Sequence, residues 1–236
     1  MSSRSQKSFA SKLGNAKKLK TIVTSFTEYQ APVPNASLEA LTTAITNIET
    51  VQQQYNTAKA DYTIKTVQRR EIFTEAPDAL ERRLSPIRTF IEAVKGKNST
   101  ELIQITSLVN KIRGNAKPKV VQITENETET ISQIERTYAS RIANFKNIID
   151  ILVSLGDTYS PPNTLIQIEA LSALAIAAEN STVAVDTCLS VLKPLINTRQ
   201  ELFTGLSQQT QSIKNFVKAQ YGLTSNEYKQ IKGISI

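Results

Sequence analysis

Histidine is absent from this chain of 236 residues, and its absence excludes several kinds of site. A Ser-His-Asp triad, a Cys-His pair, His-ligated zinc and the Glu-x-x-His signature of di-iron bundles all require it. The glycine-rich patterns that bind phosphates, Gly-x-x-x-x-Gly-Lys and Gly-x-Gly-x-x-Gly, are absent too. We therefore expect no enzyme, no catalytic residue and no cofactor. Carboxylate sites for magnesium need no local motif, so a metal-dependent hydrolase stays open as a third class of function.

The only cysteine is Cys188, so the chain cannot form an internal disulfide, which fits a reducing compartment. It stands beside Val185 and Leu189 in an apolar helical pattern, which favours a small apolar packing role over that of a nucleophile. No run of about 18 apolar residues occurs, so we expect no transmembrane helix. Met1 is not followed by an apolar signal-peptide core. These features predict a cytoplasmic protein.

Glycine and aromatic residues are also scarce, at 7 glycines and 6% aromatic residues. Ala, Leu, Ile, Gln, Lys and Glu dominate instead, and these residues favour helices. The composition predicts an all-α protein. Its length suits one large domain or two domains of about 100 residues each.

Charge is unevenly distributed along the chain, whose formal net charge is +7. The middle is acidic around residues 125–135, whereas no acidic residue precedes Glu28. The basic residues of the first segment form a candidate contact for an anion or a partner: Arg4, Lys7, Lys12, Lys17, Lys18 and Lys20. Such a segment could bind the phosphates of nucleic acid non-specifically or an anionic lipid surface, and it could also dock onto the acidic linker of the chain.

The segment "SFASKLGNAKKL" from Ser8 recurs in similar form as "TYASRIANFKNI" from Thr137. A removable transit peptide is also Ser-rich and basic, but it has no reason to recur in mid-chain, so we favour a structural helix. The match continues in order: "YQAPVPN" with "YSPPNT", then "RREIFT" with "RQELFT". We infer a repeat over 8–114 and 137–233. The predicted domains are residues 1–114 and 137–236, joined by a linker at 115–136.

The repeated "RREIFT" and "RQELFT" segments contain a duplicated polar cluster. Its members are Arg69, Glu71, Arg199 and Glu201, and each copy carries a phenylalanine that we expect to be buried, Phe73 and Phe203. One interpretation is a repeated contact site for a partner. The interpretation we favour is packing, in which each arginine lies beside a core phenylalanine and pairs with a glutamate across helices.

Apolar spacing predicts a short helix over about 8–26, then a long helix that starts near 37 in one copy and near 165 in the other. In the second copy the three-four spacing continues to Val217, like a coiled-coil seam. Gly96 and Gly222 predict helix ends. Capping boxes that start at Asn98 and Thr224 then predict a final short helix in each copy.

Pro77, Pro86 and Pro194 interrupt the long helices, but none has a counterpart in the other copy, which indicates kinks or helix restarts rather than shared turns. The predicted fold is two tandem units of short, long and short helix, packed with pseudo-two-fold symmetry as an elongated helical bundle. The alternative is a four-helix bundle broken near 76–85 and 204–208.

The chain begins "SSRSQKSF" and ends "YGLTSNEYKQIKG". In this it resembles an uncharacterised bacterial family of similar-sized, internally duplicated helical proteins, which start "SxRSxxxF" and end "YGLxSxEYxxIKG". The resemblance covers the whole chain and implies no known activity. We therefore expect a structural or scaffold protein, a subunit of a larger assembly formed with protein partners or with itself. The alternative is a basic helical protein that binds nucleic acid non-specifically.

Overall fold

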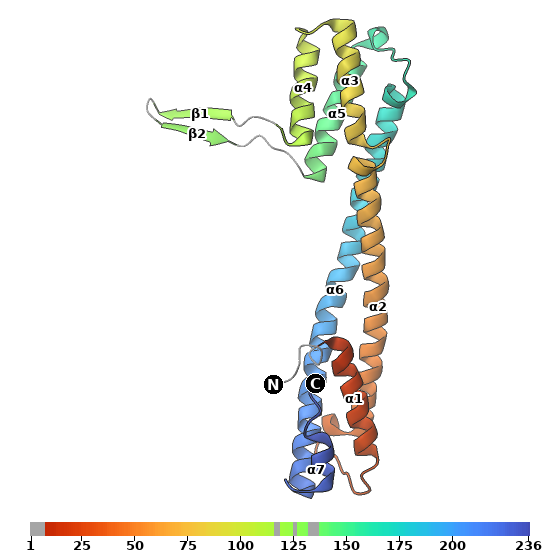
Figure 1. Ribbon diagram of the computed structural model, residues 1–236, viewed down its shortest axis with the longest axis vertical. Coiled ribbons are helices and arrows are strands. Elements are labelled where there is room, and N and C mark those ends of the chain that lie inside the picture. Colours follow the sequence, from red (N-terminus) through yellow and green to blue (C-terminus); the bar gives the residue numbers. More distant parts are fainter. Residues whose placement is uncertain (1–7, 116–118, 125–126, 132–136) are drawn as a thin grey trace. The chain divides into compact units, whose positions relative to one another are not determined.

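The computed structural model describes residues 8–115, 119–124, 127–131 and 137–236 (Figure 1). These residues are mainly helical, which confirms the predicted class. The chain divides into two compact units. We name residues 1–60 with 190–236 the terminal unit, and residues 61–189 the central unit.

The terminal unit contains α1 (Phe9–Thr24), the first part of α2 (Leu38–Arg70), the last part of α6 (Ile168–Tyr221) and α7 (Asn226–Ile231). Ser8 caps α1, because its Oγ accepts a hydrogen bond from the Ser11 backbone N at 3.1 Å. A 3₁₀ turn, η2 (Pro34–Ala36), leads into α2. The core of this unit is apolar and includes Leu19, Val23, Leu41, Ile45, Ile48, Phe203, Leu206, Ile213, Val217 and Ile231.

The central unit contains α3 (Leu80–Lys95), α4 (Thr100–Arg113), α5 (Tyr138–Ser154) and the first part of α6, which follows the 3₁₀ turns η4 (Gly156–Thr158) and η5 (Thr164–Ile166). Thr137 caps α5 as Ser8 caps α1, accepting from the Ser140 backbone N at 3.1 Å. The core includes Phe73, Leu80, Leu84, Ile87, Ile91, Ile105, Val109, Phe145, Ile148, Leu152 and Leu171. Phe73 and Phe203 are 0% and 1% exposed, so the prediction that both are buried is confirmed.

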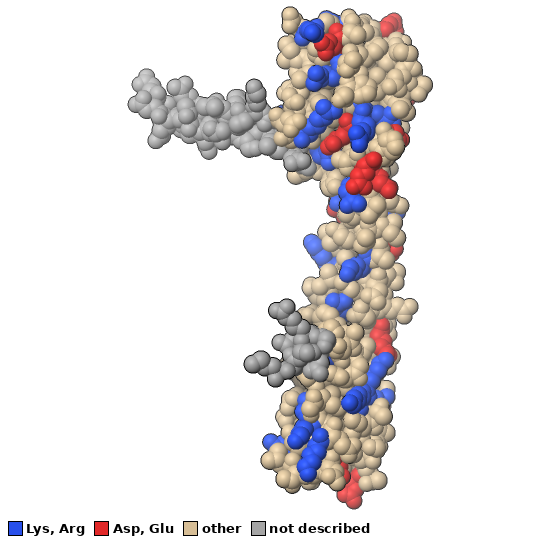
Figure 2. Space-filling view, in the orientation of Figure 1, with Lys and Arg blue, Asp and Glu red and all other residues tan. Residues whose placement is uncertain are grey.

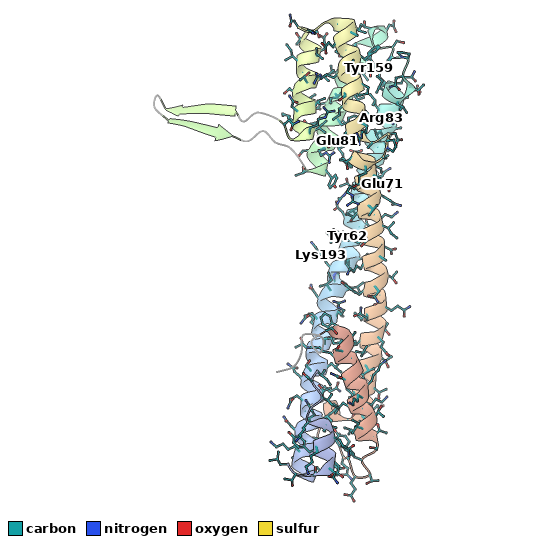
Figure 3. The ribbon with its side chains drawn as sticks, viewed as in Figure 1. Tyr62, Glu71, Glu81, Arg83, Tyr159 and Lys193 are labelled. Atoms are coloured by element: carbon teal, nitrogen blue, oxygen red, sulfur yellow. The ribbon has the colours of Figure 1, made fainter. Side chains whose placement is uncertain are left out.

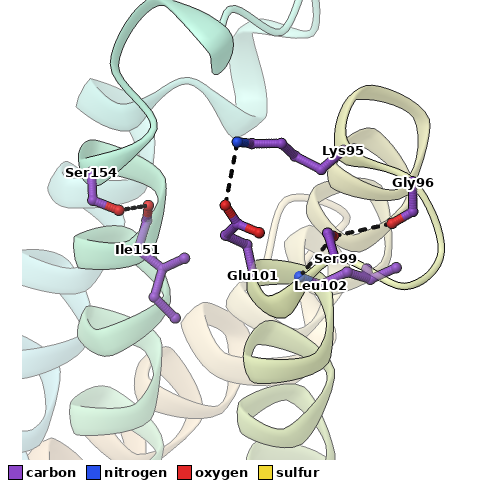
Figure 4. A network of polar contacts seen from close by, with 7 residues as sticks. All are labelled: Lys95, Gly96, Ser99, Glu101, Leu102, Ile151 and Ser154. Carbon is purple, nitrogen blue, oxygen red and sulfur yellow. Dashed lines mark hydrogen bonds and ion pairs between the residues drawn. The ribbon is translucent and has the colours of Figure 1, made fainter.

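The final helix of each predicted repeat begins one residue later than the capping boxes indicate. Ser99 caps α4, accepting from the Leu102 backbone N at 3.4 Å (Figure 4), and Ser225 caps α7, accepting from the Tyr228 backbone N at 3.1 Å. The predicted caps at Asn98 and Thr224 are therefore wrong. Serine is as good a cap as either, and the positive φ of Gly96 and Gly222 places the serines at the helix starts.

Figure 4 shows a second contact at the start of α4, where Lys95 Nζ lies 3.3 Å from Glu101 Oε1. A hydrogen bond from its own backbone N–H, then one from Lys95, lowers the pKa of Glu101. An ionised glutamate in the first turn of a helix stabilises the positive end of the helix dipole. This contact ties the end of α3 to the start of α4.

The two long helices differ in continuity. α6 is unbroken through residues 204–208, so the predicted continuous helix is confirmed there. α2 passes instead into a five-residue π-helix, η3 (Glu71–Glu75), and the helix stops at Ala76 before α3 restarts at Leu80. The alternative, a break near 76–85, is therefore correct for the first copy. Pro77 lies in that break as a helix restart, whereas Pro86 and Pro194 lie inside α3 and α6.

The predicted linker contains an antiparallel hairpin of β1 (Lys119–Thr124) and β2 (Glu127–Ile131). Its register pairs Lys119 with Ile131 and Val121 with Glu129, and it shifts between Gln122 and Thr124. The sequence predicted only a linker over 115–136, so the hairpin is an element that it did not indicate. Four of the six residues in β1 and three of the five in β2 are β-branched, a composition that favours strands.

The compact units do not coincide with the predicted repeats. The terminal unit takes the first part of the repeat over 8–114 and the second part of the repeat over 137–233. The central unit takes the two remaining parts.

Candidate functional site

The duplicated cluster of the central unit lies where the end of α2 meets the start of α5. The Cζ atom of Arg69 is 4.0 Å from the centre of the Tyr138 ring. The Tyr138 ring also meets the Phe73 ring edge-on, with centroids 4.7 Å apart and planes at 73°. Arg141, one turn further along α5, lies 4.8 Å from the Phe73 ring and pairs with Glu81 Oε1 at 2.6 Å.

The duplicated cluster of the terminal unit also combines its arginine and its phenylalanine with an aromatic ring from the first helix of the other repeat. The guanidinium of Arg199 lies between two rings, with its Cζ 3.8 Å from the Tyr55 centroid and 4.4 Å from the Phe9 centroid. Phe9 also packs on Phe203, with centroids 4.5 Å apart. Phe9 and Tyr138 are equivalent positions of the two repeats, as are Arg199 and Arg69. Each cluster therefore joins the first helix of one repeat to the "RREIFT" or "RQELFT" segment of the other.

The glutamates of the cluster do not pair with its arginines. Glu71 and Glu201 are both exposed (Figure 3 labels Glu71), and within the described ranges neither Arg69 nor Arg199 has an ion pair. The expected Arg–Glu pair across helices is therefore replaced by an arginine–aromatic contact. The Nε atoms of both arginines are buried and have no hydrogen-bond partner among the described residues.

An arginine can be half-buried in this way because its flat, delocalised cation is weakly hydrated and attracted to ring faces. The repeated segments in the sequence indicated the arginines and phenylalanines, but not Tyr55, Phe9 and Tyr138 as their partners. The aligned repeats place an aromatic residue at both equivalent positions, Phe9 and Tyr138, and this match was the sequence feature that could have indicated an aromatic contact. What the arrangement does chemically is to fix helix positions.

A second duplicated contact lies in the proline-rich turns. The Tyr29 hydroxyl donates to the Ala36 carbonyl and the Tyr159 hydroxyl to the Ile166 carbonyl, both at 2.6 Å. Phe216 meets the Tyr29 ring edge-on at 5.8 Å, and Phe90 meets the Tyr159 ring (labelled in Figure 3) at 5.3 Å. Burial raises the pKa of Tyr159 well above its ordinary value. Burial, and then Tyr221, raise the pKa of Tyr29.

The predicted basic contact falls only partly within the described residues, since Arg4 and Lys7 lie outside them. Lys12 and Lys20 are half-exposed on α1, and Lys17 pairs with Glu49 Oε1 at 2.5 Å. Lys18 is exposed and lines a hollow together with Lys229 and Lys232 from the α7 end of the chain. The sequence did not indicate these last two lysines, because they are far from the N-terminal cluster along the chain.

A larger groove of 710 Å³ lies between α2 and α6 in the terminal unit. Its lining is mainly small and polar, and its carboxylates are Glu39 and Glu201. Glu201 is the one member of the duplicated cluster that lines it. Across the described part of the chain, no three residues among His, Cys, Asp and Glu lie close enough together to hold a metal ion. Cys188 is half-buried and its thiol is free.

One described helix, α6, is long and apolar enough to cross a membrane on length and hydropathy alone. A core helix of a soluble protein has the same two properties. The mean hydropathy of one stretch of α6 is high enough for a membrane span, although the helix contains no unbroken run of about 18 apolar residues.

No protein-family model matches the chain, no curated protein matches it and no solved structure matches it.

Proposed function

We propose that the protein is a non-enzymatic helical scaffold and a subunit of a larger assembly. The observation that carries this proposal is how its duplicated residues are used. Arg69, Arg199, Phe73 and Phe203 all make packing contacts inside the chain. A duplicated catalytic or ligand site would instead direct its shared side chains into an open pocket.

We further propose that the two repeats are related by a pseudo-two-fold axis and pack by exchange, so that the first part of each repeat packs on the second part of the other. Two equivalent pairs of contacts support this. Phe9 of the first repeat packs on Phe203 of the second, while Phe73 of the first packs on Tyr138 of the second. The pairs Tyr29–Phe216 and Phe90–Tyr159 repeat the exchange at the turns. The elongated form of the bundle stays a prediction from the sequence, as does the cytoplasmic location.

The partner surface that we propose lies on the part of α6 that belongs to the central unit. Ile176 and Val183 are 56% and 63% exposed, and their spacing of seven residues places them on one face of the helix. Asn180 lies between them on that face, and the neighbouring Glu179 is paired with Lys146 Nζ at 2.5 Å. An exposed apolar helix face of this kind is typical of a surface that packs on another helix.

Light scattering coupled to size exclusion tests this proposal on the purified protein. We expect a defined oligomer whose dissociation constant rises at least tenfold in the Ile176→Ser/Val183→Ser double variant. Ile103→Ser is the matched control, since Ile103 is 62% exposed on α4, and it should leave association unchanged. A protein that is monomeric alone, and that is recovered from its native source without a partner in fixed stoichiometry, would overturn the scaffold proposal.

A further inference from the structure

The positive charge of the chain belongs to the terminal unit. Residues 1–60 and 190–236 contain 13 Lys and Arg against 5 Glu, whereas residues 61–189 contain 15 Lys and Arg against 16 Asp and Glu. The net charges are therefore +8 and −1. The N-terminal segment accounts for only part of this excess, because the segment over 190–236 adds lysines of its own. Figure 2 shows Lys and Arg side chains gathered over the α7 end.

Two distant segments bring three of these lysines to one hollow of 380 Å³. Lys18 comes from α1, Lys229 from α7, and Lys232 follows α7 directly. All three are exposed, and none has an ion pair or a hydrogen bond within the described ranges. Among the described residues that line the hollow there is no carboxylate. The rest of the lining is mainly polar and includes Asn15, Gln230 and Ser235.

The wall of the hollow is held in place by buried and hydrogen-bonded groups. Asn15 Nδ2 donates to the Ser235 carbonyl at 2.7 Å, and Lys214 Nζ donates to the Ile234 carbonyl at 2.8 Å. Ile234 is 7% exposed and belongs to the core of the terminal unit. The segment after α7 is therefore fixed against α1 and α6. Lys229 and Lys232 are three residues apart, which places them on one face.

We propose that this hollow binds a phosphate of a nucleic-acid backbone, and that the terminal unit is the nucleic-acid-binding part of the protein. Three lysines that line one hollow, without a carboxylate among the other described lining residues, attract a phosphate, and lysine contacts of this type read no base sequence. A membrane surface fits less well, because the exposed apolar side chains of this unit, such as Val33 and Leu223, do not line the hollow.

Fluorescence anisotropy with a generic labelled DNA duplex, over a salt series from about 50 to 200 mM, tests the proposal. The wild-type protein should bind with an affinity that falls steeply as salt rises. The triple variant Lys18→Gln/Lys229→Gln/Lys232→Gln removes three phosphate contacts, so the log–log salt slope should become shallower by about 2 to 3. The triple variant with arginine at the same positions should restore binding. Thermal melting by circular dichroism checks that every variant is folded.

The matched control carries the same charge change in the central unit: Arg82→Gln/Arg88→Gln/Lys97→Gln, all at exposed positions. It should leave the affinity within about twofold, because none of these residues lines the hollow. Equal losses in both glutamine triples would overturn the site, since net charge alone would then explain the binding. Absence of binding at the lowest salt would overturn the proposal. Binding to anionic lipid vesicles without binding to DNA would overturn it as well and assign the lysines to a membrane.

Discussion

At the scale of single residues, the duplicated arginines make cation–π contacts with aromatic rings. Arg199 lies between Phe9 and Tyr55, and Arg69 lies over Tyr138. The glutamates two residues further along are exposed to solvent. A helix places residues two apart on different faces, so an arginine directed to a neighbouring helix leaves the glutamate outside. The repetition of both residues in the sequence therefore does not indicate an ion pair between them.

Replacement of Arg199 by glutamine should therefore destabilise the protein, whereas replacement of Glu201 by glutamine should not. A partly desolvated cation over aromatic faces contributes about 1–2 kcal/mol, and that contribution is lost with the guanidinium. Glu201→Gln is the matched control, and urea unfolding followed by circular dichroism is the measurement. Equal destabilisation by the two variants would show that the residues form the ion pair that the sequence suggested.

Because the phenol of Tyr159 is buried, we expect the protein to lose stability at alkaline pH. Burial raises its folded-state pKa above the unfolded value, so the folded protein keeps the phenol proton to higher pH. The stabilisation is complete below the unfolded pKa of about 10 and is lost as the pH rises from there through the folded-state pKa. Tyr159→Phe should flatten this alkaline loss. It should also cost about 1 kcal/mol at neutral pH, because the hydrogen bond to Ile166 is lost.

Urea unfolding of both proteins at neutral pH and across the alkaline range measures this. A loss of stability above pH 10 that is equally steep in Tyr159→Phe would contradict the role of the buried phenol.

The sequence predicts the burial of single residues better than it predicts their contacts. Duplication and apolar spacing are enough to place Phe73 and Phe203 in the core, and both are buried. The contacts of Arg69 and Arg199 are not predictable in the same way. Their ring partners come from the other repeat, and spacing along one helix carries no information on which repeat packs against it. The lysines at 229 and 232 were missed for the same reason.

At the scale of helices and strands, α6 and α2 differ in length although their sequences are similar. α6 continues through Gly205, whereas α2 ends in a π-helix and a break that contains Pro77. Proline both lacks a backbone donor and disfavours the helical conformation in the residue before it, so the first copy stops at Ala76. The three-four spacing of apolar residues, which continues without a break to Val217, predicted the continuity of α6. The break in the first copy depended on a choice between kink and restart that the sequence left open.

Gly205 offers a direct test of this continuity. It lies inside α6 with a helical backbone, and an added Cβ would meet no atom within 4 Å. Gly205→Ala should therefore stabilise the protein by about 0.5–1 kcal/mol, because alanine loses less conformational entropy in a helix. Gly222→Ala is the control with the opposite sign, since Gly222 has a φ of 95° that alanine adopts only with strain. If Gly205→Ala lowers the melting temperature as Gly222→Ala does, the chain turns at 204–208.

The hairpin shows why composition alone misleads at this scale. A helix-rich average conceals a short segment that is rich in β-branched residues, and β1 and β2 fall in such a segment. A local count over 119–131 was the available signal. The helix starts illustrate a finer limit, since Asn98 and Ser99 are both good caps and the backbone at Gly96 decides between them.

At the scale of the whole molecule, the compact units differ from the repeats that the sequence indicates. A duplicated sequence shows which residues are equivalent, but it does not show whether each repeat folds on itself or on the other. The proposed exchange makes every packing unit depend on both repeats. Such dependence is a reason to retain both copies in one chain, and it suits a scaffold better than two independent sites would.

The central claim, that the repeats pack by exchange, is tested most directly by double-mutant cycles on Phe9. Phe9→Leu is combined with Phe203→Leu in one cycle and with Phe73→Leu in another, and the free energy of unfolding is measured in urea. Because Phe9 packs on Phe203, we expect a coupling of about 0.5–1.5 kcal/mol in the first cycle. The second cycle should be additive within about 0.5 kcal/mol, because Phe73 packs on Tyr138 instead. Coupling between Phe9 and Phe73, with additivity between Phe9 and Phe203, would mean that each repeat folds on itself and would contradict the exchange.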